Sequence, residues 1–208
     1  MSSEVDIANL ALGHLGDRAT VASLDPPEGS AQAEHCAQFY PIARDAVLEM
    51  HAWRFATRRA VLADLSLTDE PPTSWGFSYA APADCIKVLS VYQAENTRDD
   101  QGQTFDTESG EDGTDLIFTN AEDAKIRYVA RVTDTAKFSP LFVTTLSWYL
   151  ASLLAGPVIK GDAGMAVGEK CLQKTMLFLG RAQVSDANQR KGDNRDDTQN
   201  QASWIAGR

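Results

Sequence analysis

The apolar run from Leu141 to Ile159 constrains the fold more than any other feature of this chain. Apolar side chains fall on nearly every side of a helix drawn through it, which predicts burial on all faces. Ser139 and Pro140 precede the run, and serine as N-cap followed by proline in the first turn is a typical helix start. Polar and small residues interrupt the run, so we predict a core helix and not a membrane span. We expect Gly156-Pro157 to end or bend it.

Three further helices are predicted from apolar spacing. Residues 4–15 place Ile7, Ala8, Ala11, Leu12 and Leu15 at helical intervals, and Gly16 fits a C-cap. A second helix begins near Ser30 and keeps one apolar face as far as His51, with Pro41 predicting a kink or break inside it. The last helix spans residues 163–184, and one stripe along it carries Met165, Leu172, Met176, Leu179 and Ala182.

The middle of the chain has strand patterns. Residues 85–92, 116–118 and 125–132 predict strands, and residues 119–124 predict a hairpin turn between the last two. In the last strand Ile126, Tyr128 and Ala130 share one face, with Lys125, Arg127, Val129 and Arg131 on the other. Residues 75–79 also alternate in bulk, whereas residues 55–65 fit either helix or extended chain. So few strands need a helical layer or a neighbour for stability.

These patterns predict an α+β fold that is mainly α. We expect a helical bundle with a small antiparallel β-sheet insertion and an extended C-terminal arm. Residues 1–65 are assigned to the N-terminal helices, 66–136 to the β-rich insertion with its acidic loop, 137–185 to the C-terminal helices and 186–208 to the arm. The length of 208 residues suits one domain with a sizeable insertion.

Negative charge is concentrated in one segment. The chain carries a net charge of −10, and residues 93–123 contain ten acids and one base, a local charge of −9. A protein that grips DNA phosphates would show a basic patch instead. The segment is either a solvated loop or an acidic surface that does not adhere to passing DNA. The candidate residues for a channel-lining or partner-facing role are Asp99, Asp100, Asp106, Glu108, Glu111 and Asp112.

The composition changes again after Ser185. Residues 186–201 contain no large apolar side chain and cannot fold alone. Trp204 and Ile205 then follow, with Arg208 at the end. The segment is either a disordered tail or an arm that docks these three residues on a partner.

The sequence contains no spacing of residues typical of a catalytic, cofactor-binding or metal-binding site. Cys36, Cys85 and Cys171 lack ligand spacing and are expected to be buried and reduced. His35-Cys36 has no second cluster that would complete a metal site. Residues 161–170 lack the spacing of a phosphate-binding loop. Trp53, Trp75 and Trp148 are expected to anchor the core. We therefore predict no catalytic, cofactor-binding or metal-binding residue and no enzyme activity.

Several motifs follow one another in the first half of the chain. A helix ends in Leu12-Gly-His-Leu-Gly16, an apolar bridge and acid-containing loop spans residues 21–30, and an alanine-rich helix leads into Trp53-Arg-Phe-Ala56. The bulky residues of 75–79 and Pro82-Ala-Asp-Cys85 come later. In this order the motifs resemble the head–tail adaptor (connector) family of tailed phages, called tail tubular protein A in short-tailed phages. The resemblance covers residues 4–91 and extends loosely through the last two helices.

The resemblance implies a structural virion protein made in the bacterial host cytoplasm. Such adaptors form a homo-oligomeric ring, typically a dodecamer, beneath the portal protein. The ring extends the DNA channel without binding DNA specifically and is the platform for the tail nozzle or tube protein. C-terminal segments embrace the portal, which would assign that role to Trp204, Ile205 and Arg208. The acidic stretch departs from the short-tailed members and leaves the tail-side partner open. Another neck or tail-completion protein, or a small cytosolic enzyme with a dispersed site, are the alternatives.

Overall fold

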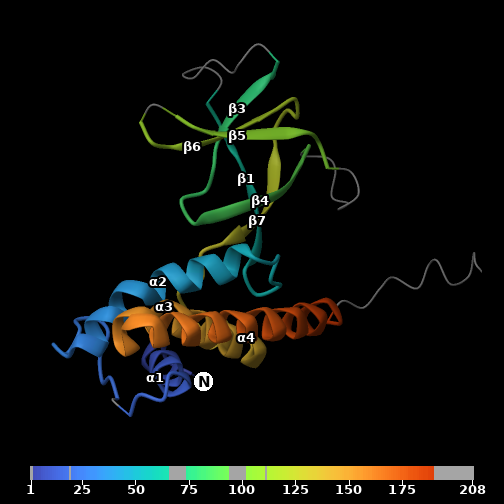
Figure 1. Cartoon of the computed structure of the whole chain (residues 1–208). Coiled ribbons are helices and arrows are strands. Elements are labelled where there is room, and N and C mark those ends of the chain that lie inside the picture. The colour runs from blue at the N-terminus through green and yellow to red at the C-terminus, as the bar shows by residue number, and fades with distance from the viewer. Residues whose placement is uncertain (1, 19, 66–73, 94–101, 111, 190–208) are drawn as a thin grey trace, which may run out of the picture.

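The computed structural model describes residues 2–18, 20–65, 74–93, 102–110 and 112–189. Figure 1 shows a helical body with a strand-built lobe on one side of it. Within the described residues the body contains four helices, which are α1 (Glu4–His14), α2 (Ala31–Glu49), α3 (Pro140–Ile159) and α4 (Gly161–Ala187). A short 3-10 helix, η1 (Thr135–Lys137), precedes α3. The α+β, mainly α fold class is confirmed.

Helix α3 lies at the centre of the body and contacts α1, α2 and α4. Phe142, Leu146, Leu150 and Leu154 have no exposed surface, whereas Trp148, Tyr149 and Leu153 are only half-buried, so the predicted burial is confirmed for one side of the helix and wrong for all faces. Its length and hydropathy would suit a membrane span, but its apolar side chains pack on the three other helices. Ser139 caps it as expected, through a 3.2 Å bond from the Phe142 N–H to the serine hydroxyl.

Neither internal proline ends its helix. Pro41 lies inside α2, where its ring is exposed and the helix continues to Glu49. Pro157 lies in the last turn of α3, and the helix continues past it to Ile159 although the proline nitrogen has no N–H to donate. The reversal into α4 comes instead at Lys160 and Gly161, which both have positive φ angles. The prediction that Gly156-Pro157 ends or bends the helix therefore placed the turn too early.

Helix α4 packs on α3 through small residues. A Cβ atom added at Gly164 would lie 2.8 Å from the Ala155 carbonyl oxygen, and one added at Gly168 would lie 3.3 Å from that of Ser152. Cys171, Thr175 and Ala182 continue the buried line toward the end of α4. Of the stripe that apolar spacing singled out, Ala182 is buried and Leu179 packs on the core, whereas Met165, Leu172 and Met176 are exposed, because two backbones this close leave no room for large side chains between them.

The strand lobe is an open barrel made from two small antiparallel sheets. One has the order β1-β7-β4 and the other β2-β3-β6-β5. Only Leu62 separates β1 from β2, so one bent segment serves both sheets. The bounds of the strands are β1 (Thr57–Val61), β2 (Ala63–Asp64), β3 (Phe77–Ala80), β4 (Cys85–Tyr92), β5 (Phe105–Ser109), β6 (Asp115–Thr119) and β7 (Lys125–Ala130).

Strand β7 belongs to two cores at once. Ile126, Tyr128 and Ala130 lie in the barrel core, whereas Val129 of the strand, and Val132 just after it, lie in the core of the helical body. The predicted alternation along this strand is therefore confirmed, and its second face is apolar where it meets the helices. Figure 1 shows α2 as the helix nearest the barrel and α1 on the far side of the body.

Two parts of the chain differ from the sequence prediction. The strands begin at Thr57 and not at residue 66, since β1 pairs with β7 over residues 57–61. Residues 55–65 fitted either helix or extended chain, because the two arginines of β1 interrupt any apolar alternation. Strand β5 lies within the segment interpreted as an acidic loop, and four of its five residues are exposed, so no apolar pattern marks it.

The α3–α4 contact gives a testable pair of substitutions. Gly164→Ala places a methyl group against a backbone oxygen and should lower the free energy of unfolding by about 1–3 kcal/mol, the usual cost of overpacking. Gly180→Ala is the matched control, because nothing lies within 4 Å of its Cβ position. It should raise stability by roughly 0.5–1 kcal/mol. Urea denaturation measures both, and equal effects would contradict the close packing.

Candidate functional site

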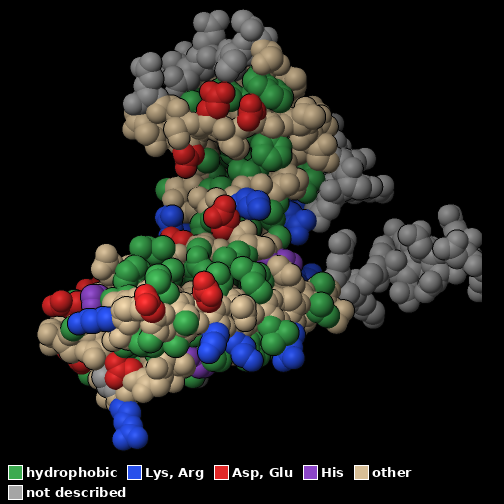
Figure 2. Space-filling view, in the orientation of Figure 1, with side chains coloured by type: hydrophobic (Ala, Val, Ile, Leu, Met, Phe, Trp, Pro, Cys, Tyr) green, Lys and Arg blue, Asp and Glu red, His purple; other side chains and the backbone are tan. Residues whose placement is uncertain are grey.

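The described residues offer contact surfaces for a functional site. Their main feature is an exposed apolar face along α4, made of Met165, Leu172 and Met176 and bordered by the half-buried Tyr149 and Leu153 of α3. The exposed fractions of Met165, Leu172 and Met176 are 66%, 40% and 52%. An open groove of about 510 Å³ between α3 and α4 is lined by most of this face. Figure 2 shows apolar side chains gathered over much of the helical body.

The position of this apolar face follows from helix geometry. Met165, Leu172 and Met176 are seven and four residues apart, which places them along one side of α4. The line of small residues beginning at Gly164 occupies the neighbouring side and packs on α3. The large side chains therefore stand beside the contact and not within it. The helical spacing of apolar residues predicted that these side chains share one side of α4. The neighbouring line of small residues is the signal that could have indicated their position outside the core.

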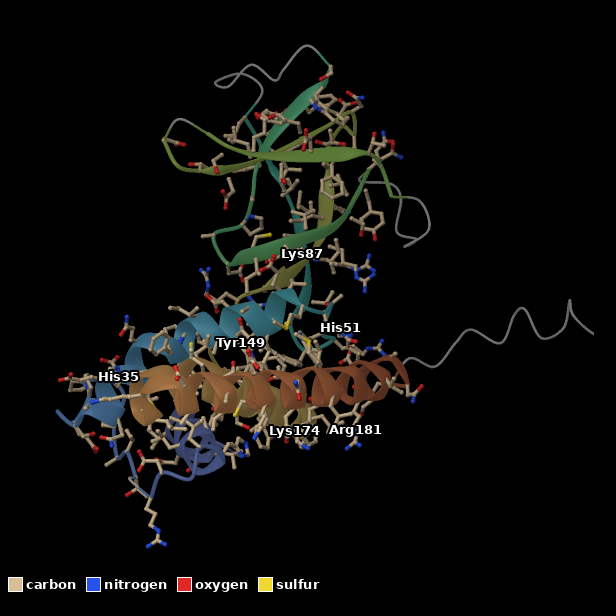
Figure 3. The ribbon with its side chains drawn as sticks, viewed as in Figure 1. His35, His51, Lys87, Tyr149, Lys174 and Arg181 are labelled. Carbon is tan, nitrogen blue, oxygen red and sulfur yellow. The ribbon has the colours of Figure 1, made fainter. Side chains whose placement is uncertain are left out.

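The opposite side of α4 is basic. Lys170, Lys174 and Arg181 follow at intervals of four and seven residues and are exposed. Figure 3 shows Lys174 and Arg181 along one edge of α4 and Tyr149 at the other. Apolar and basic surfaces thus flank one helix on its two sides. The basic side was not predicted from the sequence, because the net charge of the whole chain is negative.

An aromatic stack lies on the basic side and links three helices. Arg181 of α4 lies over Phe178, 5.5 Å from the ring centroid, and Phe178 is nearly parallel to Trp148 of α3. Trp148 in turn stacks on His14 of α1 at 3.7 Å. Ser147 donates its proton to the Thr144 carbonyl, so its oxygen accepts from His14 Nε2. Burial lowers the pKa of His14, which keeps the ring neutral.

This lowered pKa predicts a pH effect on stability. Because the folded state disfavours the charged imidazole, the unfolded chain binds the proton first as pH falls below about 6.5. The His14 contribution to stability is therefore present above that pH and lost in acid. His14→Phe keeps an aromatic ring on Trp148 but cannot titrate, so it should lose less stability than wild type between pH 7.5 and 5.5. Urea midpoints measure this, with His35→Gln as the matched histidine removal. Parallel curves for His14→Phe and wild type would refute the effect.

The end of α4 is held against the turn after α2. The Asp186 carboxylate accepts the Arg54 N–H at 3.2 and 3.3 Å and lies 3.3 Å from His51 Nε2. Asp186 was predicted to begin the C-terminal arm, but α4 continues to Ala187. The contact with Arg54 explains why a polar residue still belongs to the helix. The arm residues Trp204, Ile205 and Arg208 lie outside the described part of the chain.

The acidic candidates divide into two groups. Asp106 and Glu108 lie on β5 and Asp112 lies in the β5–β6 turn, so the fold brings these three onto one hairpin. Hydrogen bonds from the Thr114 N–H and hydroxyl, each 2.9 Å, lower the pKa of Asp112. The remaining candidates lie outside the described residues, and these are Asp99, Asp100 and Glu111.

The other polar groups singled out by the sequence have structural surroundings. Cys36 is buried and Cys85 is half-buried, and burial raises the pKa of each thiol to about 11, so both are neutral at pH 7. Asp84 accepts hydrogen bonds from Arg58 and Tyr128. Over the described ranges, no group of three or more His, Cys, Asp or Glu side chains is placed to hold a metal ion.

Among the three tryptophans expected in the core, only Trp53 is fully buried. Its indole N–H donates to the Val47 carbonyl at 2.8 Å, and its ring packs edge-on against Phe142. Trp75 and Trp148 are each half-exposed. No protein-family model matches this chain, and no curated protein matches it at a significant level.

Proposed function

We propose that this protein is a phage head–tail adaptor, a virion component that forms a ring beneath the portal. The observation that carries the proposal is the apolar face of α4, whose side chains Met165, Leu172 and Met176 are 66%, 40% and 52% exposed. Exposed apolar patches of this kind mark protein–protein contacts. The order of motifs in the N-terminal half indicates which assembly would cover it.

A closed ring requires two different surfaces on each subunit, because each copy contacts its neighbours head to tail. The apolar face of α4 is one such surface. Other exposed large apolar side chains lie on different helices, with Leu10 on α1 and Ile42 on α2. This distribution supports a head-to-tail contact over a two-fold contact, which would use one patch on both copies.

The electrostatics support a role beside DNA without DNA binding. The net charge of −10 and the acidic β5–β6 hairpin would repel a phosphate backbone. In this proposal the ring extends the DNA channel, the barrel faces the tail nozzle or tube, and the arm after α4 reaches the portal. Polar arms that order on docking are a common way to join separately assembled parts.

Ring formation is tested by a substitution on the apolar face. Met176→Glu places a charge where another subunit would pack and should abolish the ring. The side chain is 52% exposed, so the monomer should keep its stability within about 0.5 kcal/mol. Ala166→Glu is the matched control, since it is exposed on α4 outside the face. Negative-stain electron microscopy and sedimentation velocity, with and without the portal protein, give the result.

The outcomes separate the candidate functions. A wild-type ring that caps the portal, together with a monomeric Met176→Glu protein, supports the adaptor. A wild-type monomer that ignores the portal overturns it. A protein that binds an adaptor ring but not the portal is a neck or tail-completion protein of another level.

The arm is tested by deletion. Removing residues 190–208 begins after the last described helix, so the fold should be retained while portal docking is lost. Trp204→Ala in the full chain should weaken docking by about 2 kcal/mol or more per subunit, as expected of an aromatic anchor. Surface plasmon resonance against immobilised portal measures both. Equal docking by Trp204→Ala and wild type contradicts the assignment of this anchor.

A further inference from the structure

The barrel has an open seam between β4 and β5. Each is the outer strand of its own sheet. Among the described residues one bridge joins the two sides, at Val91 of β4 and Gln103 just before β5, where the Gln103 N–H donates to the Val91 carbonyl at 2.8 Å. Beyond this bridge the strands diverge, and a groove of about 390 Å³ lies between them. Figure 3 places Lys87 on β4, one of the strands that lines this groove.

The edge of β5 turns backbone hydrogen-bonding groups toward the groove. The Gly110 N–H donates to the Thr114 carbonyl at 2.7 Å, so Glu108 and Asp106 are in the bonded pairs of the β5–β6 ladder and Thr107 is in a non-bonded one. The Thr107 N–H donates at 2.8 Å to the side chain of its neighbour Asp106. Paired residues in an antiparallel ladder alternate between bonded and non-bonded pairs, so Phe105 and Ser109 present their backbone groups on the same side as Thr107. All three line the groove.

The groove has an apolar floor and an acidic rim. The floor includes Ala81, Val88, Phe105, Leu116 and Ile117. Glu108 and Asp115 also line the groove, and Lys87 is the one base among the lining residues. Residues 102–119 contain five acids and no lysine or arginine. A ligand for this site therefore combines backbone donors and acceptors, apolar side chains and positive charge.

We propose that the seam accepts an extended segment of another protein, in which apolar and basic residues alternate, as an added strand on β5. Free strand edges bind extended peptides through main-chain hydrogen bonds, while pockets select alternate side chains. Alternation suits the groove, because successive side chains of a strand point to opposite sides and meet the apolar floor and the acidic surroundings in turn. The proposed function is needed at one point alone, where it identifies the partner that supplies this segment as the tail-side component.

The test uses a fluorescein-labelled peptide of the sequence Lys-Val-Lys-Val-Lys-Val-Lys and the full-length protein. Fluorescence anisotropy should show saturable binding that weakens with salt. Two control peptides should each bind at least about tenfold more weakly, because each loses interactions with the seam. One has glutamate in place of lysine and loses the charge-assisted contacts. The other has N-methylated backbone amides and loses the main-chain hydrogen bonds. Equal binding of all three peptides overturns the proposal.

The protein variants test the strand edge directly. Thr107→Pro removes the edge N–H without removing a β5–β6 hydrogen bond, and proline is tolerated on such edges. It should raise the Kd about tenfold or more, whereas Thr107→Val keeps the N–H and should bind as wild type. Wild-type affinity in Thr107→Pro excludes strand addition. If Thr107→Pro fails to fold, hydrogen exchange of the wild-type Thr107 amide decides, because peptide binding must slow it.

Other occupants of the seam give different results. Binding that appears only after deletion of residues 190–208 shows that the arm of this chain fills the seam, and overturns the proposal. Self-association that Thr107→Pro abolishes shows that a second copy fills it, with the same consequence. None of these readouts uses the portal or the ring, so failure of the adaptor proposal leaves this test valid.

Discussion

The close approach of α4 to α3 determines most of what this molecule can do. Contact between the two backbones at Gly164 and Gly168 requires small residues at the interface. Larger apolar side chains on α4 are displaced to the side of the contact and exposed to solvent, although the helix itself is firmly packed. The same contact holds Trp148 and Phe178 in parallel, which fixes α1 through His14. An exposed apolar face is thus a product of tight packing and not of loose folding.

The two lobes differ in how the hydrogen-bonding groups of their backbones find partners. Along their length the helices satisfy their backbone groups internally, so their sides offer side chains to a partner. The barrel leaves two strand edges apart after the Val91–Gln103 bridge, so it can offer main-chain groups as well. The proposed contacts follow this division, with side-chain packing between subunits on the body and strand addition at the barrel.

The sequence predicted features that depend on local pattern. Burial of one side of α3, the Ser139 cap and the alternation along β7 all follow from residues within one element. Strand β5 was not predicted, because its exposed side chains show no apolar alternation and its formation depends on pairing with β6. The exposure of the apolar face of α4 and the seam beside Thr107 were not predicted for a related reason. Both depend on which elements become neighbours in three dimensions, and neither is encoded in one segment.

Strand β7 has a consequence for unfolding. Its two faces belong to different cores, so the barrel and the helical body share one continuous stretch of backbone and side-chain packing. Unfolding of the strand lobe would uncover Val129 and with it part of the helical core, so the two lobes are expected to unfold together and not one after the other.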